Sequence, residues 1–252
     1  KGACSARNHA LRLAQGDAIQ WLDADDLLGE GKLNAQLQLL RQNPQHLVAS
    51  KWRRFAGDLT NLWPEEQGAW ASVPEQSSPI EWLLAERMLI PAGWLASRQL
   101  FESIQPWDES LLINQDGEYF TRAILASNGV IFEPQSRVYY RSEMHGSVSQ
   151  FKPHKAPSLF ASVESFEQAV LQLGNDSAIK TLISNQYMGF IYRVYPLVPE
   201  LQKKARAKIQ QYGRPNRHND VAESAVAKTI CSIFGWKFLV QLRLLKQRLK
   251  SE

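Results

Sequence analysis

The order of hydrophobic patterns in the first third of the chain most restricts its fold. SARNHALRLAQG has apolar residues near helical spacing and ends on Gly16, which predicts a short helix. The run DAIQWLD contains Ile19, Trp21 and Leu22 and predicts a strand. LLGEGKLNAQLQLLRQNP then predicts a helix that stops at Pro44, and HLVASKWRRF predicts another strand. Helices alternating with strands are typical of an α/β domain.

The rest of the sequence divides into two regions. The Trp-, Pro- and Ser-rich stretch 61–79 predicts a long loop, and short helices and strands then alternate through Arg141. Residues 158–252 have mostly helical patterns. We therefore expect an α/β domain over residues 1–150 and a mainly helical extension over residues 151–252. Long loops in compact domains are often functional.

Charge separates the same two regions. Residues 1–150 carry 13 Lys and Arg against 18 Asp and Glu, a net charge of −5, whereas residues 151–252 carry 16 against 7, a net charge of +9. A basic extension suits an anionic surface or partner, although a solvated helical face explains the same charge equally well. We expect no nucleic-acid partner, because no binding motif accompanies the basic residues.

Composition and segment length exclude several classes of protein. The 252 residues are 44% hydrophobic, enough for one sizeable core, so the chain is not expected to be disordered. Cys4 and Cys231 lie far apart and predict neither a metal site nor a disulfide scaffold. The sequence has no apolar run of bilayer-spanning length and no signal-peptide pattern. These features predict a cytoplasmic protein.

Three aspartates, Asp23, Asp25 and Asp26, follow the first predicted strand. Ligands of open α/β sheets bind beyond the carboxyl ends of strands. In an extended segment Asp23 and Asp25 would point to the same side and could hold one Mg²⁺ or Mn²⁺ ion. Such a site leaves metal positions open for phosphate oxygens. The alternative is that Asp25 and Asp26 cap the next helix.

The segment CSARNHALRLAQGDAIQWLDADDLLGEGKLNAQLQLL resembles the middle of a family 2 glycosyltransferase with the GT-A fold. In that family a Ser-x-Arg-Asn helix precedes a glycine, an apolar strand and an Asp-x-Asp-Asp motif, which binds a metal and the diphosphate of a nucleotide-sugar. The matching residues are Ser5, Arg7, Asn8, Gly16, Asp23, Asp25 and Asp26. The resemblance implies that Asp25 and Asp23 bind Mg²⁺ or Mn²⁺, and that Arg7, Asp23 and Asp26 contact the donor diphosphate.

A second segment, PWDESLLINQDGEYFTRAI, is similar to the acceptor side of the same family. The resemblance implies that Asp116 is the catalytic base. Gln115 replaces the glutamate of the family's Glu-Asp pair and would lie beside the acceptor. Taken from the residues alone, this segment predicts a helix start in which the helix dipole favours Asp116 or Glu118.

Two further positions follow from the resemblance. YYRSEMHGSVS is similar to the stretch that closes the family's catalytic domain, so Arg141 and His145 are expected at the donor diphosphate. Trp94, in IPAGWL, lies where the family shapes its acceptor pocket, and we expect it to contact the acceptor. Core packing is the alternative role for Trp94, as for most of the other tryptophans.

The resemblance predicts a GT-A (Rossmann-like) domain with a helical C-terminal extension. Members of the family begin with two strands that bind the nucleoside, and neither precedes Lys1, so we expect an N-terminally incomplete domain. The implied function is the transfer of a sugar, with inversion, from a nucleotide-diphosphate-sugar to a saccharide or lipid-linked acceptor. This reaction would serve cell-envelope or polysaccharide synthesis in a bacterium. The alternative is a non-catalytic binding or scaffolding module.

The C-terminal tail, TICSIFGWKFLVQLRLLKQRLK, has apolar residues at helical spacing among basic ones. A basic amphipathic helix of this kind can lie in a membrane interface. We therefore weigh a peripheral contact of residues 229–252 with the inner face of the membrane. The same stripe could instead pack onto the catalytic domain, because helical cores give an identical pattern.

Overall fold

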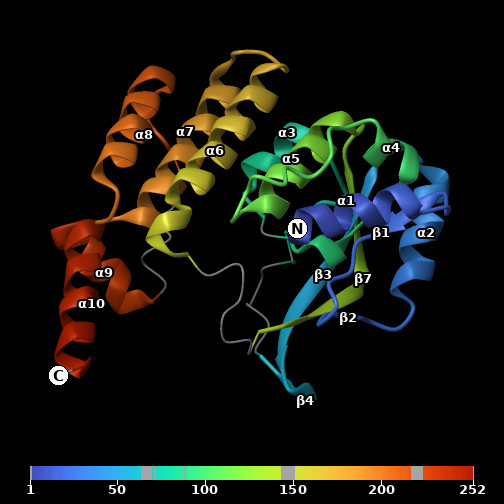
Figure 1. Cartoon of the computed structure of the whole chain (residues 1–252), viewed down its shortest axis with the longest axis horizontal. Helices are drawn as coiled ribbons and strands as arrows, with labels where there is room; N and C mark the ends of the chain where they lie inside the picture. The colour runs from blue at the N-terminus through green and yellow to red at the C-terminus, as the bar shows by residue number, and fades with distance from the viewer. Residues whose placement is uncertain are drawn as a thin grey trace.

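A mixed sheet forms the centre of the first part of the chain (Figure 1). The computed structural model describes residues 2–63, 70, 72–87, 89–142, 151–216 and 224–251. Within these residues the sheet has seven strands in the order β1-β6-β3-β7-β2, with β4 beside β3 and β5 beside β7. The strands are β1 (Ala18–Gln20), β2 (Leu27–Leu28), β3 (Leu47–Ala56), β4 (Asp58–Leu62), β5 (Gln76–Ser77), β6 (Trp94–Ser97) and β7 (Val130–Arg141).

The two long strands, β3 and β7, run parallel along the middle of the sheet, from Leu47 beside Val130 to Phe55 beside Arg141. The other recorded strand pairs are antiparallel. Five helices belong to this part: α1 (Ala3–Leu13), α2 (Lys32–Gln42), α3 (Pro79–Leu84), α4 (Arg98–Glu102) and α5 (Gln115–Ala126). The register of β3 and β7 brings the end of β7 beside the turn that follows β3.

Alternating residues of β3 pack on opposite faces of the sheet. Val48 packs with Leu40 and Leu95 under α2, whereas Leu47 and Ala49 belong to the larger core between the sheet and α5. Successive strand side chains point to opposite faces, which explains the continuous apolar run LVA in a strand buried on both sides. α5 therefore lies across the sheet from α2 (Figure 1).

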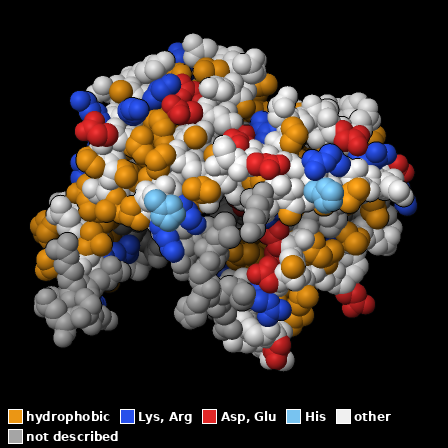
Figure 2. All heavy atoms as spheres, in the orientation of Figure 1, with side chains coloured by type: hydrophobic (Ala, Val, Ile, Leu, Met, Phe, Trp, Pro, Cys, Tyr) orange, Lys and Arg blue, Asp and Glu red, His pale blue; other side chains and the backbone are white. Residues whose placement is uncertain are grey.

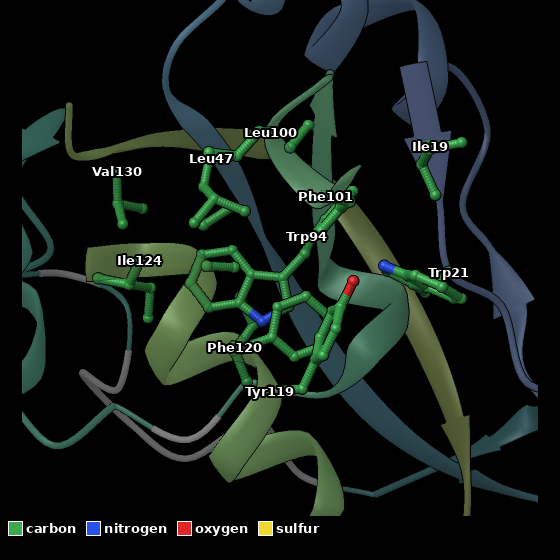
Figure 3. Close-up of a cluster of buried hydrophobic side chains, with 14 of the residues drawn as sticks. Ile19, Trp21, Leu47, Trp94, Leu100, Phe101, Tyr119, Phe120, Ile124 and Val130 are labelled. Carbon is green, nitrogen blue, oxygen red and sulfur yellow. The ribbon is translucent and has the colours of Figure 1, made fainter. Parts of the chain in front are cut away.

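Aromatic rings fill the core between the sheet and α5 (Figure 3). Trp94 of β6 stacks on Phe120 of α5 at a centroid distance of 5.4 Å. Tyr119 of α5 stacks on Trp107 at 4.0 Å with an interplanar angle of 9°. The edge of Trp21, which follows β1, contacts both rings of that second pair. Large buried rings at this density fix how α5 sits relative to the residues after β1.

The C-terminal part is helical, as expected. Its helices are α6 (Ala156–Leu171), α7 (Ser177–Val194), α8 (Pro199–Tyr212), α9 (Ala225–Phe234) and α10 (Trp236–Ser251). A second hydrophobic core lies among α6, α7 and α8, and it includes Ile113 from the segment before α5. Ile80 and Leu83 of α3 also pack against it. The first and second parts therefore share packed surfaces at α3 and α5. No described helix is long and apolar enough to cross a membrane.

The sequence patterns locate most of these elements. The predicted helix ending at Gly16, the strand after it, the next helix and the strand HLVASKWRRF correspond to α1, β1, α2 and β3. The stretch 61–79 contains the end of β4 and the short β5, while residues 64–69 and 71 lie outside the described residues. The expected α/β class with a helical C-terminal part is confirmed. The division at residue 150 stays a prediction.

Candidate active site

The three aspartates lie in a tight turn after β1. The backbone N–H of Asp26 donates to the carbonyl oxygen of Asp23 at 3.2 Å, which closes the turn. The prediction that Asp23 and Asp25 share one side of an extended segment is therefore wrong, because the backbone reverses between them. The three carboxylates instead have three different environments.

The carboxylate of Asp23 is bound by Arg7 of α1. Nη2 of Arg7 lies 2.7 Å from Oδ1 and 2.9 Å from Oδ2 of Asp23, and the guanidinium also lies 4.5 Å above the ring of Trp107. Arg7 is predicted to contact the donor diphosphate, but in this structure its charge is paired with Asp23. Its clearest role is to hold the aspartate turn against α1.

Asp26 is buried and anchors the turn to the sheet. Its Oδ1 accepts the backbone N–H of Arg141, at the end of β7, at 3.1 Å. The pKa of Asp26 is raised to about 6, chiefly by burial and also by the negative charges of Asp25 and Asp23, although the hydrogen bond from Arg141 and the charge of Arg141 lower it. The structure thus gives Asp26 a structural partner, and this carboxylate faces inward.

Arg141, which is expected at the donor diphosphate, lies next to the aspartates in the structure. Its Nε donates to the backbone oxygen of Asp25 at 3.0 Å and its Nη1 donates to the backbone oxygen of Gly57 at 2.5 Å. The guanidinium stacks 4.3 Å above the ring of Phe55. These contacts hold a positive charge beside Asp25. His145, the other predicted donor residue, lies outside the described residues.

Asp25 is the carboxylate best placed for a metal ion. Its side chain is exposed, whereas Asp23 is paired with Arg7 and Asp26 is buried. Within the described part of the chain, no group of three His, Cys, Asp or Glu side chains forms a metal cage. Mg²⁺ is often held by one or two carboxylates together with substrate phosphates and water. The donor set here fits that mode through Asp25, rather than through Asp25 and Asp23 together.

Asp116, the predicted base, lies in the first turn of α5 and is partly buried. Arg193 of α7 lies close enough for their charges to interact. Burial lowers the pKa of Arg193, and the negative charge of Asp116 counteracts this effect. The helical C-terminal part therefore places a positive charge beside the predicted base. Nothing in the sequence pattern of α7 marks Arg193 for this position.

A stack of side chains joins Asp116 to the aspartate turn. One helical turn after Asp116, the ring of Tyr119 stacks on Trp107, and Trp107 lies under the guanidinium that binds Asp23. Asn8 fixes the backbone of Trp107, because its Nδ2 donates to the Trp107 carbonyl at 2.9 Å and its Oδ1 accepts the Trp107 N–H at 2.8 Å. Asn8 is part of the family motif, but the motif does not predict its contact with Trp107.

The two predicted acceptor residues have other contacts. Trp94 is 2% exposed, with its ring between Trp82 and Phe120, so the expectation that it contacts the acceptor is wrong and its role is core packing. Its position as the first residue of β6, whose first three residues are buried, explains this outcome. The side-chain nitrogen of Gln115 donates to the carbonyl oxygen of Leu111 at 2.5 Å, which stabilises the loop before α5.

Comparisons with known proteins agree with this geometry. Residues 1–105 match the model of "Glycosyl transferase family 2". A Haemophilus influenzae protein named "Uncharacterized glycosyltransferase" is 48% identical over 48 residues, which cover 19% of this chain and 18% of that protein.

Solved structures of TarS from S. aureus share the fold. The complex of TarS 1–349 with UDP-GlcNAc matches with a TM-score of 0.63 and 14% identity, over 84% of this chain and 62% of that one. The complex with UDP matches with a TM-score of 0.57 and 14% identity, over 82% and 68%. The chain thus spans less than two thirds of the length of the first of these structures. Residues 1–105, less than half of the chain, therefore match glycosyl transferase family 2, and the chain shares the GT-A fold of these structures.

Proposed function

We propose that this chain forms part of an inverting glycosyltransferase. The enzyme transfers a sugar from a nucleotide-diphosphate-sugar to a saccharide or lipid-linked acceptor, assisted by Mg²⁺ or Mn²⁺. The observation that carries the proposal is the exposed carboxylate of Asp25, held in a fixed turn beside the guanidinium of Arg141. The titles of the TarS structures, which name UDP-GlcNAc and UDP, support a nucleotide-sugar donor.

The aspartate turn is the proposed site for the donor diphosphate. Asp25 would bind the metal ion directly, and the bound ion would neutralise charge on the departing nucleoside diphosphate. Arg141 adds a fixed positive charge on the same side of the turn. Arg7 and Asp26 hold the turn in place through Asp23 and the end of β7.

Asp116 is the proposed general base. It would accept the proton of the acceptor hydroxyl while that oxygen bonds to the anomeric carbon and the bond from this carbon to the diphosphate breaks. A single displacement of this kind inverts the anomeric centre. Arg193 lies close enough to orient the Asp116 carboxylate, so the helical C-terminal part would support the chemistry of the first part.

Calorimetric titration of UDP-sugars in MnCl₂ tests the donor site, using the chain together with any residues that precede it in its gene. Asp25→Ala should weaken donor or metal affinity at least tenfold, since losing a direct carboxylate ligand costs more than about 1.4 kcal/mol. Asp17→Asn is the matched control, because Asp17 is exposed at the opposite end of β1. Equal affinity in the Asp25→Ala protein and the control would remove the metal assignment.

A further inference from the structure

Helices α9 and α10 leave a continuous apolar surface exposed to solvent. Its six side chains are 43–70% exposed, and we call them the apolar ridge: Val226, Ile233, Phe234, Phe238, Leu242 and Leu245. The last three lie at positions i, i+4 and i+7 on one face of α10. The rings of Phe234 in α9 and Phe238 in α10 pack together, with 5.0 Å between their centroids, and join the two helices. Figure 2 shows hydrophobic side chains along this edge of the molecule, at the left of the view.

The two helices are fixed to the rest of the protein by a different face. Ala227 and Leu239 are buried between α9 and α10. The ring of Trp236 contacts Tyr192 at 4.9 Å and Tyr195 at 5.0 Å, which docks the pair on α7. The packing on α7 thus uses Ala227, Trp236 and Leu239, which lie outside the predicted apolar stripe. Most of the stripe does not pack onto the catalytic domain and forms the exposed apolar ridge instead.

The charge around the apolar ridge indicates what covers it. Residues 225–251 contain six Lys or Arg and no Asp or Glu. Lys228, Lys237, Arg243 and Lys246 are exposed on these two helices, and the Lys237 amine lies over the rings of Tyr195 and Trp236. A second copy of the chain would bring the same positive charge against it, which opposes self-association. An apolar surface on helices whose charged side chains are all basic over residues 225–251 is instead complementary to a bilayer surface that contains anionic lipid.

We propose that the apolar ridge inserts into the interface of an anionic membrane, with α9 and α10 lying along the surface. Since no described helix is long and apolar enough to cross a bilayer, the contact is peripheral. Figure 1 shows α10 and the end of β7, where Arg141 lies, directed toward the same side of the molecule, the lower edge of the view. The proposal does not depend on the proposed sugar transfer, because it concerns binding alone.

Vesicle co-sedimentation tests the proposal. The chain should pellet with vesicles containing about a third phosphatidylglycerol and not with phosphatidylcholine alone. The triple variant Phe238→Ser, Leu242→Ser, Leu245→Ser should stay in the supernatant. The variant Lys237→Gln, Arg243→Gln, Lys246→Gln should bind on the order of a hundredfold more weakly. The matched control is Leu173→Ser with Leu197→Ser, two exposed leucines outside α9 and α10.

A second measurement needs no variant. Hydrogen exchange of the wild-type chain should slow across residues 226–246 when anionic vesicles are added and stay unchanged elsewhere. Equal pelleting with neutral vesicles, or unchanged pelleting of the ridge variant, would overturn the proposal. So would light scattering that shows a wild-type dimer which the ridge variant converts to a monomer, since a second copy would then be the true occupant.

Discussion

Lys32, the first residue of α2, should make the stability of this protein depend on pH. Its side chain is 1% exposed, and Nζ donates to Oε1 of Gln20 at 2.6 Å and to Oε1 of Gln36. Burial lowers the pKa of Lys32 from 10.5 to about 7, although the negative charge of Glu133 opposes this change. The neutral amine can still donate both hydrogen bonds, so the folded protein tolerates deprotonation well.

The sign of the effect follows from proton binding. Below about pH 7 the lysine is protonated in both the folded and the unfolded chain, so its contribution does not change with pH. Between about pH 7 and 10.5 the unfolded chain binds the proton and the folded chain does not, so the free energy of unfolding rises with pH. The slope approaches 1.36 kcal/mol per pH unit, which gives up to about 5 kcal/mol over the whole interval.

Replacing Lys32 with Met removes this slope. Between about pH 7 and about pH 10, the free energy of unfolding of wild type should rise by about 4 kcal/mol relative to that of Lys32→Met. Urea denaturation at several pH values measures it. Lys203→Met, at an exposed position of α8, is the control, because water solvates that amine in both states. Parallel pH profiles for wild type and Lys32→Met would refute the reasoning.

Two further predictions concern stability and are read from urea denaturation. Asn8→Ala should cost about 2 kcal/mol or more, because it leaves the buried backbone N–H and C=O of Trp107 without their partner. Gly129→Ala should destabilise far more than Gly174→Ala. Both glycines have positive φ, but only at Gly129 would the new Cβ lie 2.5 Å from the backbone oxygen of Ser77. Equal losses for the two alanine variants would contradict the crowding at Gly129.

Local patterns were enough to predict the elements that surround the candidate site. α1, β1, α2 and β3 follow from apolar spacing and from stop signals such as Pro44, because these elements bury one or two faces in a regular period. The family motif named Arg141 as a donor residue, but it did not predict the contact of Arg141 with the backbone oxygen of Asp25. The individual environments of the aspartates were not predicted either, because a turn replaces the extended geometry that the alternation rule assumes.

The sequence patterns did not predict the long-range contacts. The pairing of Arg7 with Asp23 and the approach of Arg193 to Asp116 depend on how helices pack, and α7 shows only an ordinary helical pattern. Trp94 illustrates the converse error. The family resemblance placed Trp94 at the acceptor, but it follows a 3-10 turn and its ring fills the core, which was the alternative role.

The most direct test of the proposed reaction separates donor binding from transfer at Asp116. Donor affinity is measured by calorimetry, and transfer to a saccharide acceptor by release of the nucleoside diphosphate, with NMR reporting the anomeric configuration of the product. Asp116→Asn should keep donor affinity while transfer falls about 10²-fold or more, and wild type should give the inverted product. Asp17→Asn should match wild type in both assays. Near-normal transfer by Asp116→Asn, or a product that retains the donor's configuration, would contradict the account.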